Sequence, residues 1–135
     1  MSTINTLLDE MWESYISYTP SAAKIAKLFD ENIVNDHIAF RTLNLEACNI
    51  HKQANYLSKF GYRVGGDYYF EQKKLNAIHL ENENSNLPKI FLSELMLEKF
   101  SPELNDCFKN IVNSIDIPEK DLFMGGRSWD IDFEI

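Results

Sequence analysis

The first part of the chain has apolar residues at a helical period. They recur every three or four positions over about three turns, at Ile4, Leu7, Leu8, Met11, Trp12, Tyr15 and Ile16. This spacing predicts an amphipathic helix. Pro20 ends that helix, and Thr19 or Ser21 can cap a second one. The expected buried stripe of the second helix is Ala22, Ile25, Ala26 and Phe29.

The period changes to two in residues 33–43. This segment is rich in β-branched and aromatic residues that alternate along the chain, which predicts a strand. One face of the strand would carry Val34, Ile38 and Phe40. The other face would carry Asn35, His37, Ala39 and Arg41.

The rest of the chain predicts one helix, three strands and a last helix. Asn44 can cap a helix over 46–59, and Gly61 would end it. Extended segments follow at 62–72, 75–81 and 89–95, with Gly65-Gly66 read as a bend or bulge in the first of them. Ser101-Pro102 then opens a helix. Its apolar side is Leu104, Cys107, Phe108, Ile111, Val112 and Ile115, and the tail from Gly125 is loop-like.

These elements predict an α+β fold in a single domain over residues 1–135. A strand, a crossover helix and three further strands form a β-α-β-β-β module with a curved mixed sheet, preceded by two helices and followed by one. Helices would cover one face of the sheet. The other face would be concave and would need a ligand or a second module.

Composition and charge exclude several function classes. Apolar residues make up 44% of the chain, which is enough for a core, and no apolar run approaches the length that spans a bilayer. The formal net charge of −8 disfavours nucleic-acid binding. Two cysteines do not make a disulfide framework, so we expect a reducing, cytoplasmic compartment.

His37 and Arg41 are the most informative pair. They lie four residues apart on one face of the first strand, which places their Cα atoms about 13 Å apart. Imidazole is a common ligand for iron and zinc, and guanidinium holds a carboxylate through two hydrogen bonds. A metal and a carboxylate substrate could therefore lie along the strand. The alternative is a partly buried His37 and an Arg41 paired with Asp67 or Glu94.

His79 and Glu94 extend this hypothesis. His79 is expected on the third strand and Glu94 near the end of the fourth. If both faced the concave side, they would complete with His37 the two-histidine, one-carboxylate set that holds non-haem iron. No short-range spacing enforces that arrangement.

Three blocks of residues resemble a known family. They are VNDHIAFRT at 34–42, YFEQKKL at 69–75 and LPKIFLSEL at 87–95. Together they resemble the 2-oxoadipate dioxygenase/decarboxylase (hydroxyglutarate synthase-type) family, which is related to the vicinal oxygen chelate, or glyoxalase-like, superfold. The resemblance implies a non-haem iron(II) enzyme that converts a 2-oxo acid and dioxygen into a 2-hydroxy acid and carbon dioxide. It implies that His37 is a metal ligand and that Arg41 holds a substrate carboxylate, and we include Ser93 among the expected substrate-binding residues.

The chain departs from the family pattern in its metal site. The family's second metal histidine, in an NHxT-type block, and its metal glutamate belong to a second module, and neither block is present here. We therefore expect the N-terminal half of a two-module enzyme, in which a missing C-terminal module or a second chain supplies the other ligands, or His79 and Glu94 replace them. No catalytic side chain is assigned, and iron(II) is expected in the complete enzyme.

Two other functions stay open. The first is a homodimeric glyoxalase-like isomerase or lyase, with His37 and Glu94 contributed by each chain. The second is a non-catalytic module that binds a carboxylate through Arg41 without metal. Stoichiometric metal in the chain would favour the first of these. Arg41-dependent 2-oxo acid binding without metal would favour the second.

Overall fold

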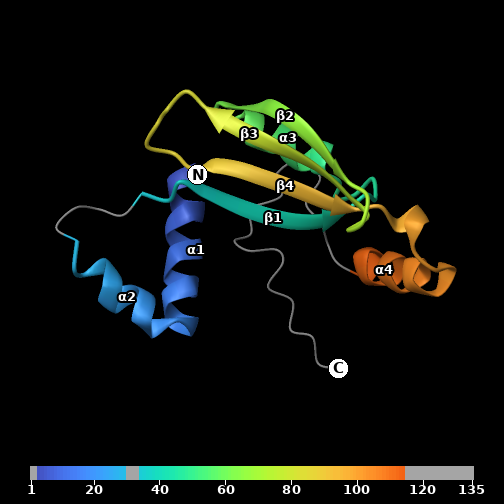
Figure 1. Ribbon diagram of the computed structural model, residues 1–135, viewed down its shortest axis with the longest axis horizontal. Helices are drawn as coiled ribbons and strands as arrows, with labels where there is room; N and C mark the ends of the chain where they lie inside the picture. The colour runs from blue at the N-terminus through green and yellow to red at the C-terminus, as the bar shows by residue number, and fades with distance from the viewer. Residues whose placement is uncertain (1–2, 30–33, 115–135) are drawn as a thin grey trace.

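The structure is a computed structural model that describes residues 3–29 and 34–114. Its elements, in chain order, are α1 (Ile4–Tyr18), α2 (Pro20–Ala26), β1 (His37–Leu43), α3 (Ile50–Ser58), β2 (Tyr62–Phe70), β3 (Leu75–Asn82), β4 (Lys89–Leu95), the short 3-10 helix η1 (Leu97–Lys99) and α4 (Pro102–Ser114) (Figure 1). Three predicted parts of the chain lie outside the described residues: Ile33, Ile115 and the tail from Gly125.

The four strands form one mixed sheet in the order β1-β4-β3-β2. β1 pairs with β4 in parallel, and β4–β3 and β3–β2 pair antiparallel. β1 can pair in parallel with β4 because the long segment from α3 to β3 connects them as a crossover. The expected α+β fold with a β-α-β-β-β module is thereby confirmed.

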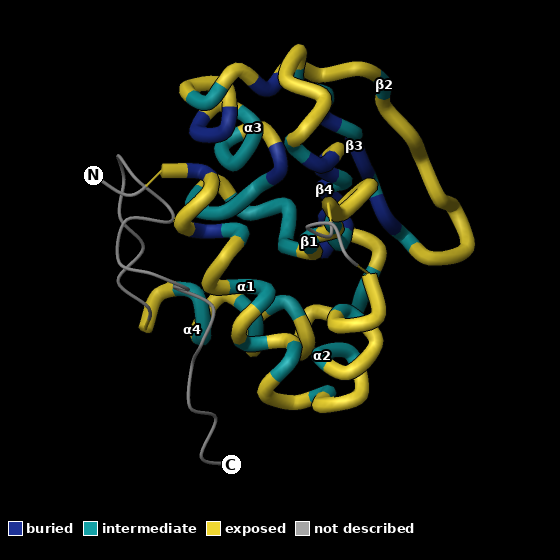
Figure 2. Tube along the Cα trace, turned by 90° about the vertical axis from the view of Figure 1, so that its left-hand side faces the viewer, coloured by how far each residue is buried: buried dark blue, intermediate teal, exposed yellow. Residues whose placement is uncertain are grey.

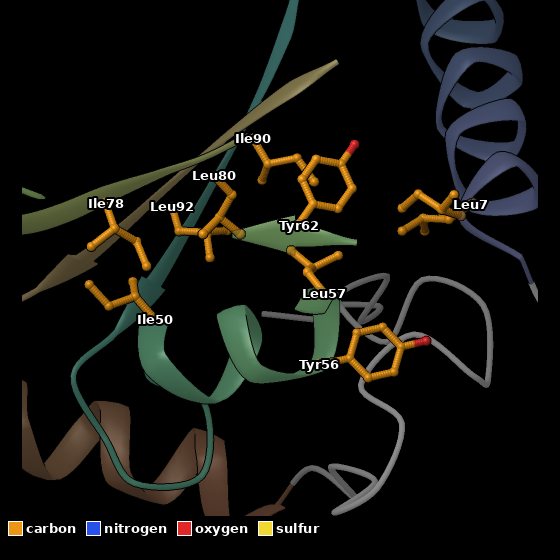
Figure 3. Packing of buried hydrophobic residues seen from close by; sticks show 10 residues of the cluster. Leu7, Ile50, Tyr56, Leu57, Tyr62, Ile78, Leu80, Ile90 and Leu92 are labelled. Carbon is orange, nitrogen blue, oxygen red and sulfur yellow. The ribbon is translucent and has the colours of Figure 1, made fainter. Parts of the chain in front are cut away.

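The core lies between α3 and one face of the sheet. Leu57 of α3 and Leu92 of β4 are fully buried, and Ile50 and Leu80 are nearly so. Figure 3 shows these side chains meeting between the helix and the strands, with Leu7 of α1 directed toward Tyr62 and Leu57. Burial of each such side chain contributes roughly 1.5–3 kcal/mol, so this layer fixes which sheet face is covered.

Local signals set several element ends. The Asn49 side chain accepts a hydrogen bond from Lys52 N at 2.9 Å and caps α3. Gly61, with φ +88°, follows the end of α3 in the left-handed region that favours glycine. Ser101 Oγ accepts from Leu104 N at 3.3 Å and opens α4 as expected.

Two predicted element starts are wrong. β1 begins at His37 rather than at residue 33, and Val34, expected on the same strand face as Ile38 and Phe40, is 57% exposed. α3 begins at Ile50 rather than at residue 46. Asn44 does not cap it, because its side chain binds η1 instead: Oδ1 accepts from Leu97 N at 3.1 Å and Nδ2 donates to Glu98 at 2.7 Å.

The predicted buried stripe of α2 is also wrong. Ile25 is 55% and Phe29 is 60% exposed, and no residue of α2 is buried. The helical spacing is present, but within the described residues α2 packs mainly against α1. α4 also has an apolar side, and none of its residues is buried.

The second face of the sheet is not covered by any helix that the structure describes. None of the described helices other than α3 makes broad contact with the strands. Figure 2 shows buried residues gathered in β3, β4 and α3, and exposed residues along most of β2. Within the described residues, no helix combines the length and apolarity that a membrane crossing requires.

Candidate functional site

The strand register brings the predicted site residues to one face. Across the sheet, Arg41 is level with Ser93, Ala77 and Tyr68, and Ala39 is level with Phe91, His79 and Gly66. Alternation along each strand places these rows on the side away from α3. We call this surface the open face; its residues are His37, Ala39, Arg41, Arg63, Gly66, Tyr68, Ala77, His79, Glu81, Lys89, Phe91 and Ser93.

His37 projects from the first position of β1 on the open face. Its side chain is 69% exposed, and its Nδ1 atom lies 3.1 Å from Asp36 Oδ2. A carboxylate that accepts the Nδ1 hydrogen leaves the Nε2 lone pair for a metal, which is the usual outer-sphere arrangement of a ligating histidine. The geometry of His37 therefore fits one metal ligand, and the alternative of a partly buried core histidine is wrong.

Arg41 lies two alternations along the same strand and faces the same way as His37. It is exposed, and among the described residues it forms no ion pair. The proposed partners Asp67 and Glu94 are level with Ile78 and Thr42, on the helix-covered side of the sheet. Arg41 is therefore not paired with Asp67 or with Glu94.

Ser93 is the neighbour of Arg41 on β4. It faces the open side but is only 5% exposed, and its hydroxyl donates to the Phe40 carbonyl at 3.4 Å. Its role in substrate binding stays a prediction.

Glu94 does not join the histidines. Because Ser93 faces the open side, the next residue faces α3, where the buried Glu94 accepts a hydrogen bond from Ile50 N at 3.1 Å. Glu94 thus binds the N-terminus of α3, where a carboxylate is favoured. The predicted set of His37, His79 and Glu94 is not assembled within the chain.

His79 is on the open face, but both of its ring nitrogens are engaged. Nδ1 lies 2.8 Å from Tyr68 Oη, and Nε2 lies 3.1 Å from Glu81 Oε1. No group of three His, Cys, Asp or Glu residues that could hold a metal occurs in the part of the chain that the structure describes. His37 is thus the metal-ligand candidate whose geometry fits.

Sequence reasoning missed Tyr68 and Glu81 as partners of His79. Neither side chain was among the expected site residues. A signal was present in Gly65-Gly66, because two glycines opposite a histidine on a neighbouring strand indicate that a ring needs room.

Comparison with known families matches most of the chain. Residues 1–125 match the model of the 2-oxoadipate dioxygenase/decarboxylase family. A chloroplastic/amyloplastic 2-oxoadipate dioxygenase/decarboxylase of Oryza sativa subsp. japonica is 27% identical over 98% of this chain, and the match covers 40% of that protein. A chloroplastic relative with the same name, from Arabidopsis thaliana, is 25% identical over 80% of the chain and 33% of its own length. The chain thus spans less than half the length of these relatives.

Solved structures share the fold. A protein from Shewanella frigidimarina NCIMB 400, provisionally named a hydrolase, superimposes with a TM-score of 0.78 at 42% identity over 86% of this chain and 46% of its own. The Oryza sativa hydroxyglutarate synthase in complex with 2-oxoadipate gives a TM-score of 0.70 at 28% identity, over 81% of this chain and 39% of its own. A Ralstonia eutropha JMP134 protein assigned provisionally to the glyoxalase superfamily gives 0.67 at 15% identity, over 82% of this chain and 38% of its own, which supports the fold alone.

Proposed function

Because the chain belongs to the 2-oxoadipate dioxygenase/decarboxylase family, we propose that its open face is one half of a non-haem iron(II) site. At this site a 2-oxo dicarboxylic acid such as 2-oxoadipate reacts with dioxygen to give a 2-hydroxy acid and carbon dioxide. One observation carries the proposal. His37 and Arg41 project from the same strand to the same exposed face, with neither engaged by a residue of the core.

The two side chains have separate tasks. Iron(II), when bound, supplies open coordination positions for dioxygen and a 2-oxo acid. His37 offers its Nε2 lone pair, and Asp36 fixes the orientation of the ring through Nδ1. Arg41 holds the carboxylate remote from the reacting carbons, since guanidinium and carboxylate match in two parallel hydrogen bonds.

The remaining metal ligands come from outside the described residues in this proposal. One imidazole is too few for a facial set of two histidines and one carboxylate, and Glu94 lies on the covered face. A second module or a second chain that packs over the open face would bring them, and the short span of the match to the relatives supports this. A homodimeric isomerase built from His37 and Glu94 would need both side chains on the open face. Glu94 lies on the covered face, so no observation favours that function.

A binding experiment tests the role of Arg41. Calorimetry would compare 2-oxoadipate with 2-oxohexanoate, which lacks the second carboxylate. We expect the wild-type chain to bind 2-oxoadipate more tightly by about tenfold or more, because a charge-assisted hydrogen bond contributes about 1.5–3 kcal/mol. Arg41→Ala should abolish this preference and leave 2-oxohexanoate binding unchanged. Lys24→Ala, which removes an exposed positive charge from α2, is the matched control.

The role of His37 as a metal ligand is tested by NMR spectroscopy of the same samples. Under anaerobic conditions, added iron(II) should broaden the ring resonances of His37 at lower concentration than those of His51, which is exposed on α3. His37→Ala should remove the early broadening without changing the fold, because the side chain is exposed and leaves no cavity. Equal broadening of both histidines, or equal binding of the two 2-oxo acids, would contradict the proposal.

A further inference from the structure

Three residues on β2 and β3 form a hydrogen-bonded chain on the open face. Tyr68 Oη lies 2.8 Å from His79 Nδ1, and His79 Nε2 lies 3.1 Å from Glu81 Oε1. The Tyr68 side chain is partly exposed, and that of His79 is 23% exposed. In such a chain the carboxylate determines which imidazole nitrogen carries the hydrogen. The imidazole in turn determines whether the hydroxyl donates or accepts a hydrogen bond. Neither the metal hypothesis nor the core uses this arrangement.

The backbone of β2 is shaped to hold the imidazole. The pairing of β2 with β3 shifts between Val64 and Gly66, so that Gly65 is accommodated in a bulge. A Cβ on Gly65 would clash with His79 Nε2, and one on Gly66 would lie 3.0 Å from His79 Cε1 and 3.3 Å from Tyr68 Oη. The two glycines therefore leave room for the ring in this one position.

The carboxylate determines which nitrogen carries the hydrogen. The hydrogen bond from His79 is the main cause that lowers the pKa of Glu81, and nearby positive charges, among them Lys89 and Arg63, lower it further against desolvation. Glu81 is therefore an acceptor, and a neutral His79 carries its hydrogen on Nε2. Nδ1 is then an acceptor, and the Tyr68 hydroxyl donates to it.

This direction has a consequence for an anionic ligand. While the Tyr68 hydroxyl donates to Nδ1, it presents only oxygen lone pairs to the open face, which repel a carboxylate or carbonyl oxygen. The hydroxyl can turn to such a ligand if Nδ1 acquires a hydrogen. Moving the hydrogen from Nε2 would leave a lone pair against the Glu81 carboxylate, so a second proton from solvent is favoured instead.

The position of Tyr68 fits a ligand that Arg41 holds. Both residues lie in the same row of the sheet, separated by the small side chains of Ala77 and Ser93. The Tyr68 ring leans toward β4, with its centroid 6.0 Å from that of Phe91. The ionisable groups around His79 on this face are Tyr68 and Arg63 of β2, Glu81 of β3, Lys89 of β4, and His37 and Arg41 of β1. Of these, Tyr68 and Glu81 bond to the ring.

We propose that Tyr68, His79 and Glu81 form a binding site for one anionic or carbonyl oxygen of the 2-oxo acid, and that binding takes up one proton at His79 Nδ1. This deepens the proposed function and rests on it. In the bound state Tyr68 donates to the ligand, the imidazolium donates to Tyr68 from Nδ1 and to Glu81 from Nε2, and no other bond changes. Tyr68 contacts the ligand, and His79 and Glu81 are positioning residues.

Proton uptake gives a direct test. Calorimetry of the wild-type chain with 2-oxoadipate at about pH 8, where an ordinary histidine is neutral, would be repeated in buffers of different ionisation enthalpy. We expect uptake approaching one proton per ligand, and binding that weakens by up to about tenfold per pH unit as the solution is made more alkaline than pH 8. Tyr68→Phe and His79→Gln should lose the uptake and bind about tenfold more weakly. Tyr69→Phe, the adjacent residue on the opposite face, is the matched control.

Two further measurements separate the outcomes. In the free chain, the ¹⁵N spectrum of labelled histidine should show His79 as the Nε2–H tautomer, and Glu81→Gln should weaken that preference. A dominant Nδ1–H tautomer would overturn the inference without reference to any ligand. Binding that depends on Arg41 but takes up no proton would overturn the inference and leave the proposed function standing. Proton uptake that persists in Arg41→Ala would support the inference and contradict the role of Arg41. A wild-type chain that binds no 2-oxoadipate would overturn both.

Discussion

At the scale of single residues, the sheet separates two kinds of polar side chain. Tyr62 and Glu94 point into the covered side, where each satisfies one backbone group of a neighbouring segment. His37 and Arg41 point to the open face and contribute nothing to the core. Substitutions of the first kind should therefore change stability, and those of the second kind should change binding.

Tyr62 gives the clearest case of a residue that couples stability to pH. Its ring is 3% exposed, its hydroxyl donates to the Pro88 carbonyl at 2.8 Å, and burial raises its pKa from 10.0 to about 12. Between these values the unfolded chain has lost the phenolic proton and the folded chain retains it, so stability falls as pH rises. Below about pH 10 the contribution of Tyr62 is fully present.

We predict that the alkaline loss of stability is smaller in Tyr62→Phe. At neutral pH this variant should be less stable by about 1 kcal/mol, because the Pro88 carbonyl loses its donor. Between pH 10 and about 12 the difference in the free energy of unfolding between the wild type and Tyr62→Phe should become smaller or change sign. Urea unfolding at a series of pH values measures both effects, and Tyr69→Phe on the exposed strand surface is the control. Parallel stability curves for Tyr62→Phe and the wild type would contradict the prediction.

At the scale of elements, α3 is anchored to the sheet from two sides. Ile50 and Leu57 pack on the strands, and the first backbone N–H of the helix binds Glu94 of β4. Asn49 satisfies a second N–H at the same end. A helix of nine residues is too short to be stable alone, so its formation depends on these tertiary contacts.

We predict that Glu94 stabilises the fold and has no part in metal binding. Glu94→Ala should destabilise the chain by about 1–3 kcal/mol, because a buried N–H loses its partner, and Glu94→Gln by less, since an amide oxygen can still accept. Thermal unfolding measures the change. The broadening of His37 by iron(II) should be the same in both variants as in the wild type. Loss of that broadening at unchanged stability would return Glu94 to the role of a ligand.

Most helices and strands of this structure could be predicted from the sequence, but some of their contacts could not. Periodicity found every helix and strand of the described residues except the short η1, and the bounds of β4 agree with the prediction. It failed for Asn44 because a cap and a long-range hydrogen bond use the same side chain, and only the fold decides between them. It failed for Ile25 because amphipathic spacing does not specify a partner.

The candidate site could likewise be predicted within one strand but not between strands. Alternation within β1 was sufficient to place His37 and Arg41 together, since both lie on one strand. The relation of His79 and Glu94 to them depends on the register between strands, which no local pattern contains. The Tyr68–His79–Glu81 chain could not be predicted from the sequence, because it depends on the bulge at Gly65 that brings β2 against the imidazole.

At the scale of the whole molecule, no described helix packs on one side of the sheet. β1 and β2 are both edge strands, and exposed aromatic residues such as Tyr68 and Phe70 lie along β2. A sheet face without a covering helix among the described residues, flanked by two edge strands, invites pairing with another chain. The proposed function requires that something cover this face, because the described residues offer His37 alone as a fitting metal ligand.

We predict that the isolated 135-residue chain associates with itself as its concentration rises. Light scattering after size-exclusion chromatography should show an average mass that grows from that of the monomer. Ala39→Glu places a charge in the middle of the open face of β1, where Ala39 is exposed, and should shift the equilibrium toward monomer. Asn55→Asp makes the same change of charge on exposed α3, on the covered side of the sheet, and should have no effect. A monomer at every concentration, or equal effects of the two variants, would show that the open face does not mediate contact between copies.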